Sequence, residues 1–175
     1  MNKIALMLLG AVLLSACSKQ RNHKDDGGCM PGPVSCNMPA AYTANEAKRT
    51  IAQGLWGTLA FQEGNCMPIQ DPANTTCRTC PVQRKLRIYP YTIMQHVAPI
   101  DGAFYNGFPN SPVATVMPDA EGFFQVSLPD GRYSVLAEEG GKLYAFGWDA
   151  QGGVSPVTVA GITKANLTFT YRATF

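Results

Sequence analysis

Histidine is scarce in this chain, with only His23 and His96 among 175 residues. A serine-histidine-aspartate hydrolase needs a histidine base, and only His96 lies outside the polar N-terminal stretch. The sequence also lacks a glycine-rich phosphate loop and the His-Glu-x-x-His motif of zinc peptidases. Its acidic residues stand at turns, where they are more typical of solvated caps than of a glycosidase pair. We therefore expect no catalytic residue, no bound metal and no cofactor.

An excess of charge of either sign is also absent. The chain carries 14 basic and 12 acidic side chains, and removal of Lys3 with a leader would leave 13 basic ones. Proteins that bind nucleic acid concentrate positive charge on one face, so this composition gives no electrostatic case for a nucleic-acid partner. Beyond residue 17, no apolar run is long enough to form a transmembrane helix.

The first 17 residues follow an order that is typical of exported proteins. A basic start at Lys3 precedes an apolar stretch over residues 4–14, which is too short to span a bilayer as a helix. The chain then continues with Leu14-Ser15-Ala16-Cys17. These four residues resemble the lipobox of bacterial lipoproteins.

This resemblance implies a lipoprotein signal peptide over residues 1–16 and a lipidated Cys17, with a diacylglycerol on its sulfur and an acyl chain such as palmitate on its nitrogen. Two or three acyl chains hold a protein firmly at a membrane, whereas one chain binds only marginally. Ser18 follows the cysteine, and by analogy with sorting in enteric bacteria it favours the outer membrane. The alternative is an ordinary secretory signal that happens to contain a cysteine.

Residues 17–53 are expected to form a lipidated tether. They begin with several charged residues and continue through Gly27 and Gly28 into a stretch rich in proline and cysteine. Such a composition cannot bury enough apolar surface to fold alone. Within this tether, residues 44–53 have the composition of a helix of two or three turns, which could pack on the domain that follows.

From residue 54 onward, the apolar residues recur with a period of two, which is typical of strands with one buried face. The runs are short, rich in β-branched and aromatic residues, and separated by turn-forming residues, with no ten-residue helical pattern between them. We therefore expect an all-β domain over residues 54–175, an antiparallel β-sandwich of about seven strands. The expected strands lie in residues 54–61, 86–91, 124–128, 133–137, 143–148, 154–159 and 167–175.

The strongest local signal is the Pro-Asp-Gly sequence at residues 129–131, whose residue types favour a tight turn. A two-residue loop at residues 130–131 would place six apolar side chains on one buried face. A three-residue loop with a bulge suits the proline better but splits these side chains between two faces. Because each large apolar side chain left in water forfeits about 1.5–3 kcal/mol, we expect the two-residue hairpin. It would pair Leu128 with Tyr133, Val126 with Val135, and Phe124 with Ala137.

Residues 122–135, with the sequence Gly-Phe-Phe-Gln-Val-Ser-Leu-Pro-Asp-Gly-Arg-Tyr-Ser-Val, resemble the central hairpin of carboxypeptidase regulatory-like domains. The resemblance covers residues 54–175 and implies a transthyretin-like β-sandwich, often found on bacterial envelope proteins, with no catalytic motif of its own. Residues 62–80, a cysteine-containing insertion, and residues 94–111, a long aromatic connection, depart from the family pattern. The other segments similar to the family are residues 57–61, 81–82, 86–89, 157–159 and 167–169.

Five cysteines follow Cys17, and in an exported chain they are expected to form disulfides. Their odd number leaves one thiol free or bonded to another molecule. One bond could join the first two in a small ring, and another could staple the inserted loop by joining the third to the fourth or to the fifth. The five are Cys29, Cys36, Cys66, Cys77 and Cys80.

The spacing of Cys77 and Cys80 also permits a redox function. Cys-x-x-Cys is the spacing of thioredoxin-type pairs, and Arg78 could favour a thiolate. Such pairs normally open a helix after a buried strand, and no helical pattern follows here. Together with Cys66 and His96 these cysteines could also bind zinc, but the second pair of a zinc knuckle is missing.

Aromatic residues give the best indication of a binding surface. Tyr105 and Phe108 lie on the long connection, and Tyr89 and Tyr91 lie at the end of an expected strand. Exposed rings beside amides can stack on sugars or hold a peptide, so these four are candidate partner-binding residues. Trp56 and Trp148 could reach the same rim, which the loops at one end of the sandwich would form. The alternative is that these rings fill the open end of the sandwich.

Together these features predict a non-catalytic, lipid-anchored protein of the cell envelope, located in the outer membrane. We expect it to bind or scaffold a protein or glycan partner, through loops at one end of the sandwich, and to meet the membrane only through its lipid. This expectation is a fold-level analogy. The alternative is an envelope enzyme, either a thiol oxidoreductase that uses Cys77 and Cys80 or a hydrolase.

Overall fold

The computed structural model describes residues 36–68 and 75–175. The expected signal peptide, Cys17 and Cys29 lie outside these residues. The described chain forms a β-sandwich of two sheets with one α-helix, α1 (Met38–Lys48), which confirms the expected all-β class. None of the helices that these residues form has the length and apolar character needed to span a membrane.

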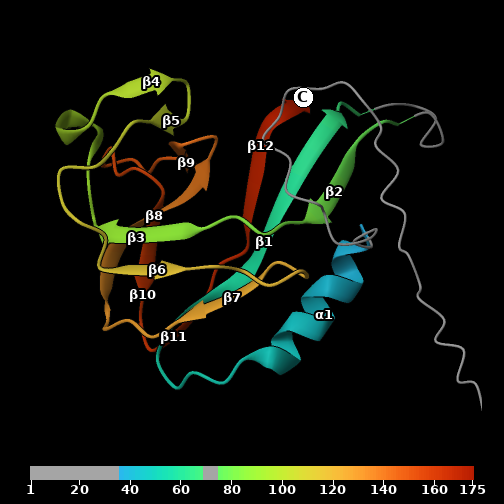
Figure 1. Cartoon of the computed structure of the whole chain (residues 1–175), viewed down its shortest axis with the longest axis horizontal. Coiled ribbons are helices and arrows are strands. Elements are labelled where there is room, and N and C mark those ends of the chain that lie inside the picture. The colour runs from blue at the N-terminus through green and yellow to red at the C-terminus, as the bar shows by residue number, and fades with distance from the viewer. Residues whose placement is uncertain (1–35, 69–74) are drawn as a thin grey trace, which may run out of the picture. The chain divides into compact units, whose positions relative to one another are not determined.

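Sheet 1 is built around the long strand β1 (Gly54–Asn65), which has two shorter strands on each side (Figure 1). On one side β11 and β12 run parallel to β1, and on the other β7 and β2 run antiparallel to it. Among the described strands β12 pairs only with β1, so its far side is an edge of the sheet. The shorter strands are β2 (Arg78–Pro81), β7 (Phe123–Val126), β11 (Ile162–Lys164) and β12 (Leu167–Thr174).

Sheet 2 is built in the same way around β8 (Gly131–Glu139). This strand pairs with β3 on one side, and on the other side with β10 near its start and β9 near its end. The sheet then extends from β3 to β6, and from β9 to β5 and β4. These strands are β3 (Leu86–Pro90), β4 (Pro99–Asp101), β5 (Phe104–Tyr105), β6 (Ala114–Val116), β9 (Lys142–Ala145) and β10 (Pro156–Val159).

The main core lies between the two sheets, and all seven segments expected to be strands contain one. Gly57 of β1 shows why the junction of β11 and β12 can lie so close to this core. A Cβ atom on Gly57 would lie 1.9 Å from the carbonyl oxygen of Ala165, so any larger residue would push the junction away. The buried side chains of the main core are Leu55, Leu59, Leu86, Ile88, Phe124, Leu128, Val135, Ala137, Tyr144, Val159, Leu167 and Phe169.

A second, smaller cluster lies on the outer face of sheet 2. Successive side chains of a strand point to opposite faces, so Leu136 belongs to this cluster while its neighbours Val135 and Ala137 belong to the main core. Val97 and Phe108 pack over this cluster from the long connection between β3 and β6. That connection contains the short 3₁₀ helix η2 (Met94–His96) as well as β4 and β5.

The expected hairpin at residues 129–131 is wrong. Strand β7 pairs with β1 in sheet 1, whereas β8 belongs to sheet 2, so the turn connects the two sheets. The six side chains expected on one face do share one core, but they reach it from opposite layers. Asp130 fixes this turn by accepting the backbone N–H of Gly161 at 2.7 Å.

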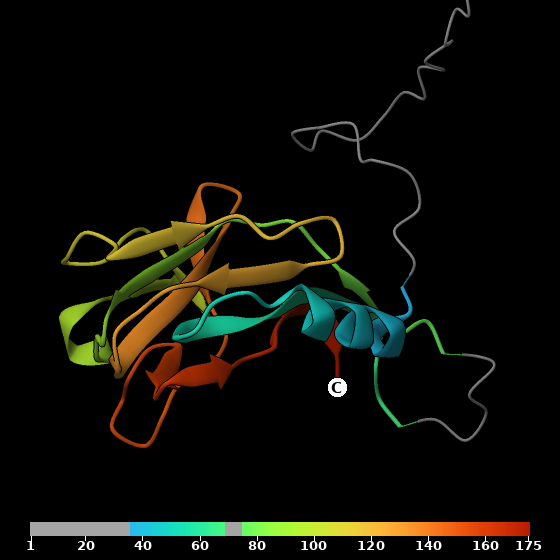
Figure 2. The same cartoon turned by 90° about the horizontal axis from the view of Figure 1, so that it is seen from below.

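Helix α1 lies beside β1, as Figure 2 shows, and is held to sheet 1 by its buried residues. Asn37 caps its first turn by accepting the N–H of Ala40 at 3.1 Å. Fully buried Asn45 donates to Thr58 Oγ1 at 2.9 Å and to the carbonyl oxygen of Glu121 at 3.0 Å. The helix begins and ends earlier than the expected range 44–53, and the folded part therefore includes residues that the sequence assigns to the tether.

Two disulfides connect β2 and the residue before it to other segments of the described chain. Cys66 bonds to Cys77, which joins the end of β1 to the start of β2 and selects one of the two pairings expected for Cys66. Cys36 bonds to Cys80 rather than to Cys29. Of the expected insertion, residues 62–65 extend β1 and residues 78–80 belong to β2, its antiparallel partner.

Candidate functional site

Two of the four aromatic candidates are core residues. Tyr105 is fully buried and Tyr89 nearly so, and both belong to the second cluster. The ring of Phe108 packs on them, with centroids 4.8 Å from Tyr89 and 5.8 Å from Tyr105. These contacts favour the alternative that the rings fill the sandwich. Burial also raises the pKa of Tyr89, which keeps its phenol neutral.

Tyr91 lies in a polar cluster with Asp149 and Arg132. Its hydroxyl donates to Asp149, and the guanidinium of Arg132 lies 3.9 Å from its ring centroid while bonding Asp149 at 2.7 Å. Burial raises the pKa of Asp149, but hydrogen bonds from the Gly153 N–H and from Tyr91 outweigh it and hold the pKa below the ordinary value. Both the ring face and the hydroxyl of Tyr91 are therefore occupied by contacts within the protein.

An open groove lies on a different side of the sandwich, where β12 faces β9 and β10. It consists of two adjoining pockets of about 490 and 460 Å³, which share Phe146 and Trp148. We call this surface the edge groove. It is lined by residues 101–104, 144–148, 155–157, 165–168 and 170–171.

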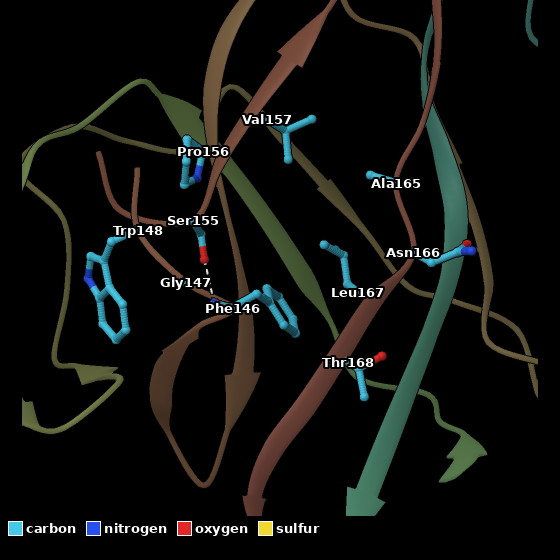
Figure 3. A pocket seen from close by; sticks show the side chains of 10 residues that line it. All are labelled: Phe146, Gly147, Trp148, Ser155, Pro156, Val157, Ala165, Asn166, Leu167 and Thr168. Atoms are coloured by element: carbon cyan, nitrogen blue, oxygen red, sulfur yellow. Dashed lines mark hydrogen bonds between the residues drawn. The ribbon is translucent and has the colours of Figure 1, made fainter. Parts of the chain in front are cut away.

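One half of the edge groove is seen in Figure 3. Residues 155–157 lie on one side of the opening and residues 165–168 on the other, while the Phe146 ring and Leu167 point toward each other between them. Buried Ser155 shapes this half, because its hydroxyl accepts the N–H of Phe146 at 2.6 Å and its φ is 46°. Among the described residues it is the only non-glycine with a positive φ, a backbone strain that is typical of functional sites.

Aromatic rings form the other half of the edge groove. Phe104 lies 5.3 Å from Tyr144 and 5.2 Å from Tyr171 in edge-to-face contacts, and Tyr144 lies 5.3 Å from Phe146. Trp148 is 47% exposed, and its indole N–H donates to the hydroxyl of Tyr105 at 3.1 Å. Buried Tyr105 therefore holds the exposed tryptophan in place, although it offers no surface itself.

Two cations stand at this aromatic half. The ammonium of Lys142 lies 6.0 Å from the Phe104 centroid, and the guanidinium of Arg172 lies 5.7 Å from the Tyr171 centroid. Within the described parts of the chain neither forms an ion pair. Asp101 is the single acidic residue among those that line the edge groove.

The cysteines do not form a redox pair in the structure, because Cys77 and Cys80 are bonded to different partners. Residues 36–68 and 75–175 also contain no group of three or more potential metal-binding side chains. Trp56, which was expected near the aromatic rim, instead lies on sheet 1 beneath the ammonium of Lys164, 4.9 Å from its ring.

The sequence pattern did not identify the edge groove. Its lining comes from segments that are separated by up to 70 residues, and no local motif joins them. The signal that was available is the alternation of β12, whose edge position follows only from its pairing with β1 alone among the described strands. No protein-family model matches this chain, and no curated protein matches it.

Proposed function

We propose that this protein is a lipid-anchored, non-catalytic binding or scaffolding protein of the cell envelope, which holds a partner in the edge groove. The observation that carries the proposal is the groove itself. Binding sites are typically concave and mostly apolar with a few polar groups. The edge groove is concave and places exposed Trp148 and half-buried Phe146 and Tyr171 beside the hydroxyls of Thr168 and Thr170, and its surface is more polar than this general pattern.

The side chains of the groove support binding rather than catalysis. The described residues that line it include no histidine, cysteine or lysine, and Asp101 stands without a second carboxylate. General acid-base catalysis needs at least one positioned group that exchanges a proton near neutral pH. Ser155 is buried, and its hydroxyl accepts the backbone N–H of Phe146.

An envelope location is supported by the two disulfides, since such bonds persist in oxidising compartments. The lipobox-like residues 14–17 support a lipid anchor on Cys17, and Ser18 favours a location in the outer membrane. We further propose a relation to carboxypeptidase regulatory-like domains, which the residue types of 122–135 and the two-layer sandwich support. The pairing of β7 with β1 rather than with β8 departs from the hairpin that this resemblance implies.

Metabolic labelling with radioactive palmitate tests the anchor. The wild-type chain is expected to incorporate label and to fractionate with outer membranes, and Cys17→Ala is expected to lose both. An unlabelled wild-type chain would contradict the anchor.

Substitution in the edge groove tests the binding role. Trp148→Ala is expected to abolish capture of the envelope partner. Ile162→Ala serves as the matched control, because Ile162 is similarly exposed but lies on β11, outside the groove. Equal capture by both variants would contradict a binding function at this site.

A further inference from the structure

The free edge of β12 borders the edge groove from Leu167 to Tyr171. Among the described strands β12 pairs with β1 alone, so its other side presents backbone groups without a sheet partner. Extended peptides bind such edges through main-chain hydrogen bonds. The groove follows the chain from Ala165 to Tyr171, a length of about 20 Å at roughly 3.3 Å per residue, which suits six or seven extended residues.

One backbone donor of this edge is held by a side chain from the opposite sheet. The N–H of Thr170 donates to the hydroxyl oxygen of Tyr144 at 3.2 Å, so it points away from β1. The phenol occupies the position that a carbonyl oxygen of an added strand would take. An incoming strand would therefore compete with Tyr144 for this N–H.

The two pockets of the edge groove suit the side chains of an added strand. One lies over Phe146 and Leu167, and the other over Phe104 and Tyr171. In an extended peptide every second side chain points to the same face. Alternate apolar side chains would thus enter the pockets while the residues between them point to solvent.

The charges at the groove indicate the sign of the partner. Within the described residues, three Lys or Arg side chains form no ion pair: Arg49, Lys142 and Arg172. Lys142 lies beside Phe104 and Arg172 lies beside Tyr171, at the border of the groove, and Asp101 is the single acidic residue of the lining. A partner with carboxylates at this end would complement them.

We propose that the occupant of the edge groove is an extended acidic peptide, which adds to β12 as an extra strand and places carboxylates beside Lys142 and Arg172. The inference rests on the proposed binding function and specifies its partner. A glycan would stack on the aromatic rings, but it would use neither a series of backbone groups on β12 nor the two cations.

The experiment uses the full mature chain and four probes. The first is a capped octapeptide of alternating valine and glutamate, and the second has lysine in place of glutamate. The third is the first peptide with N-methyl groups on alternate backbone nitrogens, made in both registers, and the fourth is a panel of neutral oligosaccharides. Isothermal titration calorimetry measures binding, so that variants without Trp148 are tested in the same way as the wild type.

The glutamate peptide is expected to bind and the lysine peptide is not. N-methylation in one register should weaken binding about tenfold, because it removes main-chain donors. Lys142→Glu and Arg172→Glu should each weaken binding about two- to fivefold, whereas Arg49→Glu, the matched reversal at the C-terminal end of α1, should not. Tyr144→Phe should strengthen binding, because it removes the competitor for the Thr170 N–H while keeping the ring.

Several outcomes would overturn the inference. Equal binding of the two charged peptides excludes the acidic partner, and indifference to N-methylation or to Tyr144→Phe excludes strand addition. Oligosaccharide binding that Trp148→Ala abolishes, without peptide binding, overturns the inference and leaves the proposed binding function intact. Thermal unfolding of each variant shows whether it is folded, and the surface variants at Lys142 and Arg172 keep the test valid if Tyr144→Phe is unstable.

Discussion

The hydroxyl oxygen of Tyr144, in sheet 2, accepts the backbone N–H of Thr170, in sheet 1, at 3.2 Å. It also lies 3.2 Å from the Thr170 hydroxyl. The ring of the same tyrosine is buried in the main core against Phe169, with centroids 4.9 Å apart. A single side chain therefore fills the core and satisfies an edge donor of the facing sheet.

Tyr144→Phe is expected to lower the free energy of unfolding by about 0.5–1.5 kcal/mol, because both hydrogen bonds of its hydroxyl to Thr170 are lost while the packing of the ring stays. Urea unfolding of the unliganded protein measures this change. Tyr42→Phe is the control, since no hydrogen bond of the Tyr42 hydroxyl occurs among the described residues. An equal loss in both variants would show that the contact to Thr170 contributes nothing.

The two disulfides are expected to differ in their contribution to stability. The bond between Cys36 and Cys80 closes a loop of sequence separation 44, and that between Cys66 and Cys77 a loop of separation 11. The loss of unfolded-state entropy then gives about 4 and 3 kcal/mol respectively. Paired replacement by alanine, followed by urea unfolding, should rank the two double variants in this order. The reverse ranking would contradict an entropic origin.

Tyr105 and Trp148 are joined by one hydrogen bond, yet we expect opposite effects of their removal. Tyr105→Ala should cost about 3–5 kcal/mol of unfolding free energy, because it empties a fully buried site. Trp148→Ala should change stability much less, since the indole is 47% exposed. Thermal unfolding decides between them, and a stable Tyr105→Ala that has lost its partner would restore Tyr105 as a contact residue.

Glu138 should make stability depend on pH in the acidic range. A hydrogen bond from Lys85 lowers its pKa most, burial opposes this, and Arg87 lowers the pKa further, so the folded pKa lies below the ordinary 4.5. The ionised carboxylate therefore stabilises the fold above about pH 4.5, and this contribution is lost as the pH falls through the lowered folded pKa.

The difference in unfolding free energy between the wild type and Glu138→Gln should consequently shrink as acid is added below pH 4.5. Glu46→Gln is the control. Its partner Lys164 also lowers the pKa of Glu46, but this side chain is 60% exposed and the pair is screened by water and salt. A difference that grows on acidification would reverse the assigned sign.

Asn45→Ala should destabilise the protein by about 2 kcal/mol, because it leaves buried Thr58 Oγ1 and the Glu121 carbonyl without their donor. Glu46→Ala, one position along α1 and exposed to solvent, is the matched control. Chemical denaturation followed by circular dichroism measures both. Equal stability of the two variants would show that α1 is not held to sheet 1 through Asn45.

The sequence pattern predicted the strands well because alternation depends only on which side chains are buried. It failed on the pairing of β7 with β8 for the same reason. Phe124 and Val135 are both buried in the main core, and burial looks the same whether two strands lie side by side or in facing layers. The turn residues at 129–131 fit either case, since a tight turn can also lead from one sheet to the other.

The candidate site was predicted less well. Tyr105 was chosen because it lies on the long connection and Tyr89 because it lies at the end of an expected strand, but Phe108 packs on both of them in the second cluster. The edge groove depends on contacts between segments as distant as Phe104 and Tyr171, which no local spacing encodes. The bond between Cys36 and Cys80 is non-local in the same sense.

That bond also determines how tension would enter the domain. A pull on the chain that precedes Cys36 passes through its sulfur directly to Cys80 in β2. The covalent shortcut bypasses α1, so the helix is not peeled from the sheet when the N-terminal segment is stretched. The load instead enters β2, which is joined to β1 by the antiparallel ladder, where Cys80 pairs with Phe61, and by the bond between Cys66 and Cys77. Reducing this single bond would redirect the same pull onto the helix and its few buried contacts, and we expect the domain to yield there first.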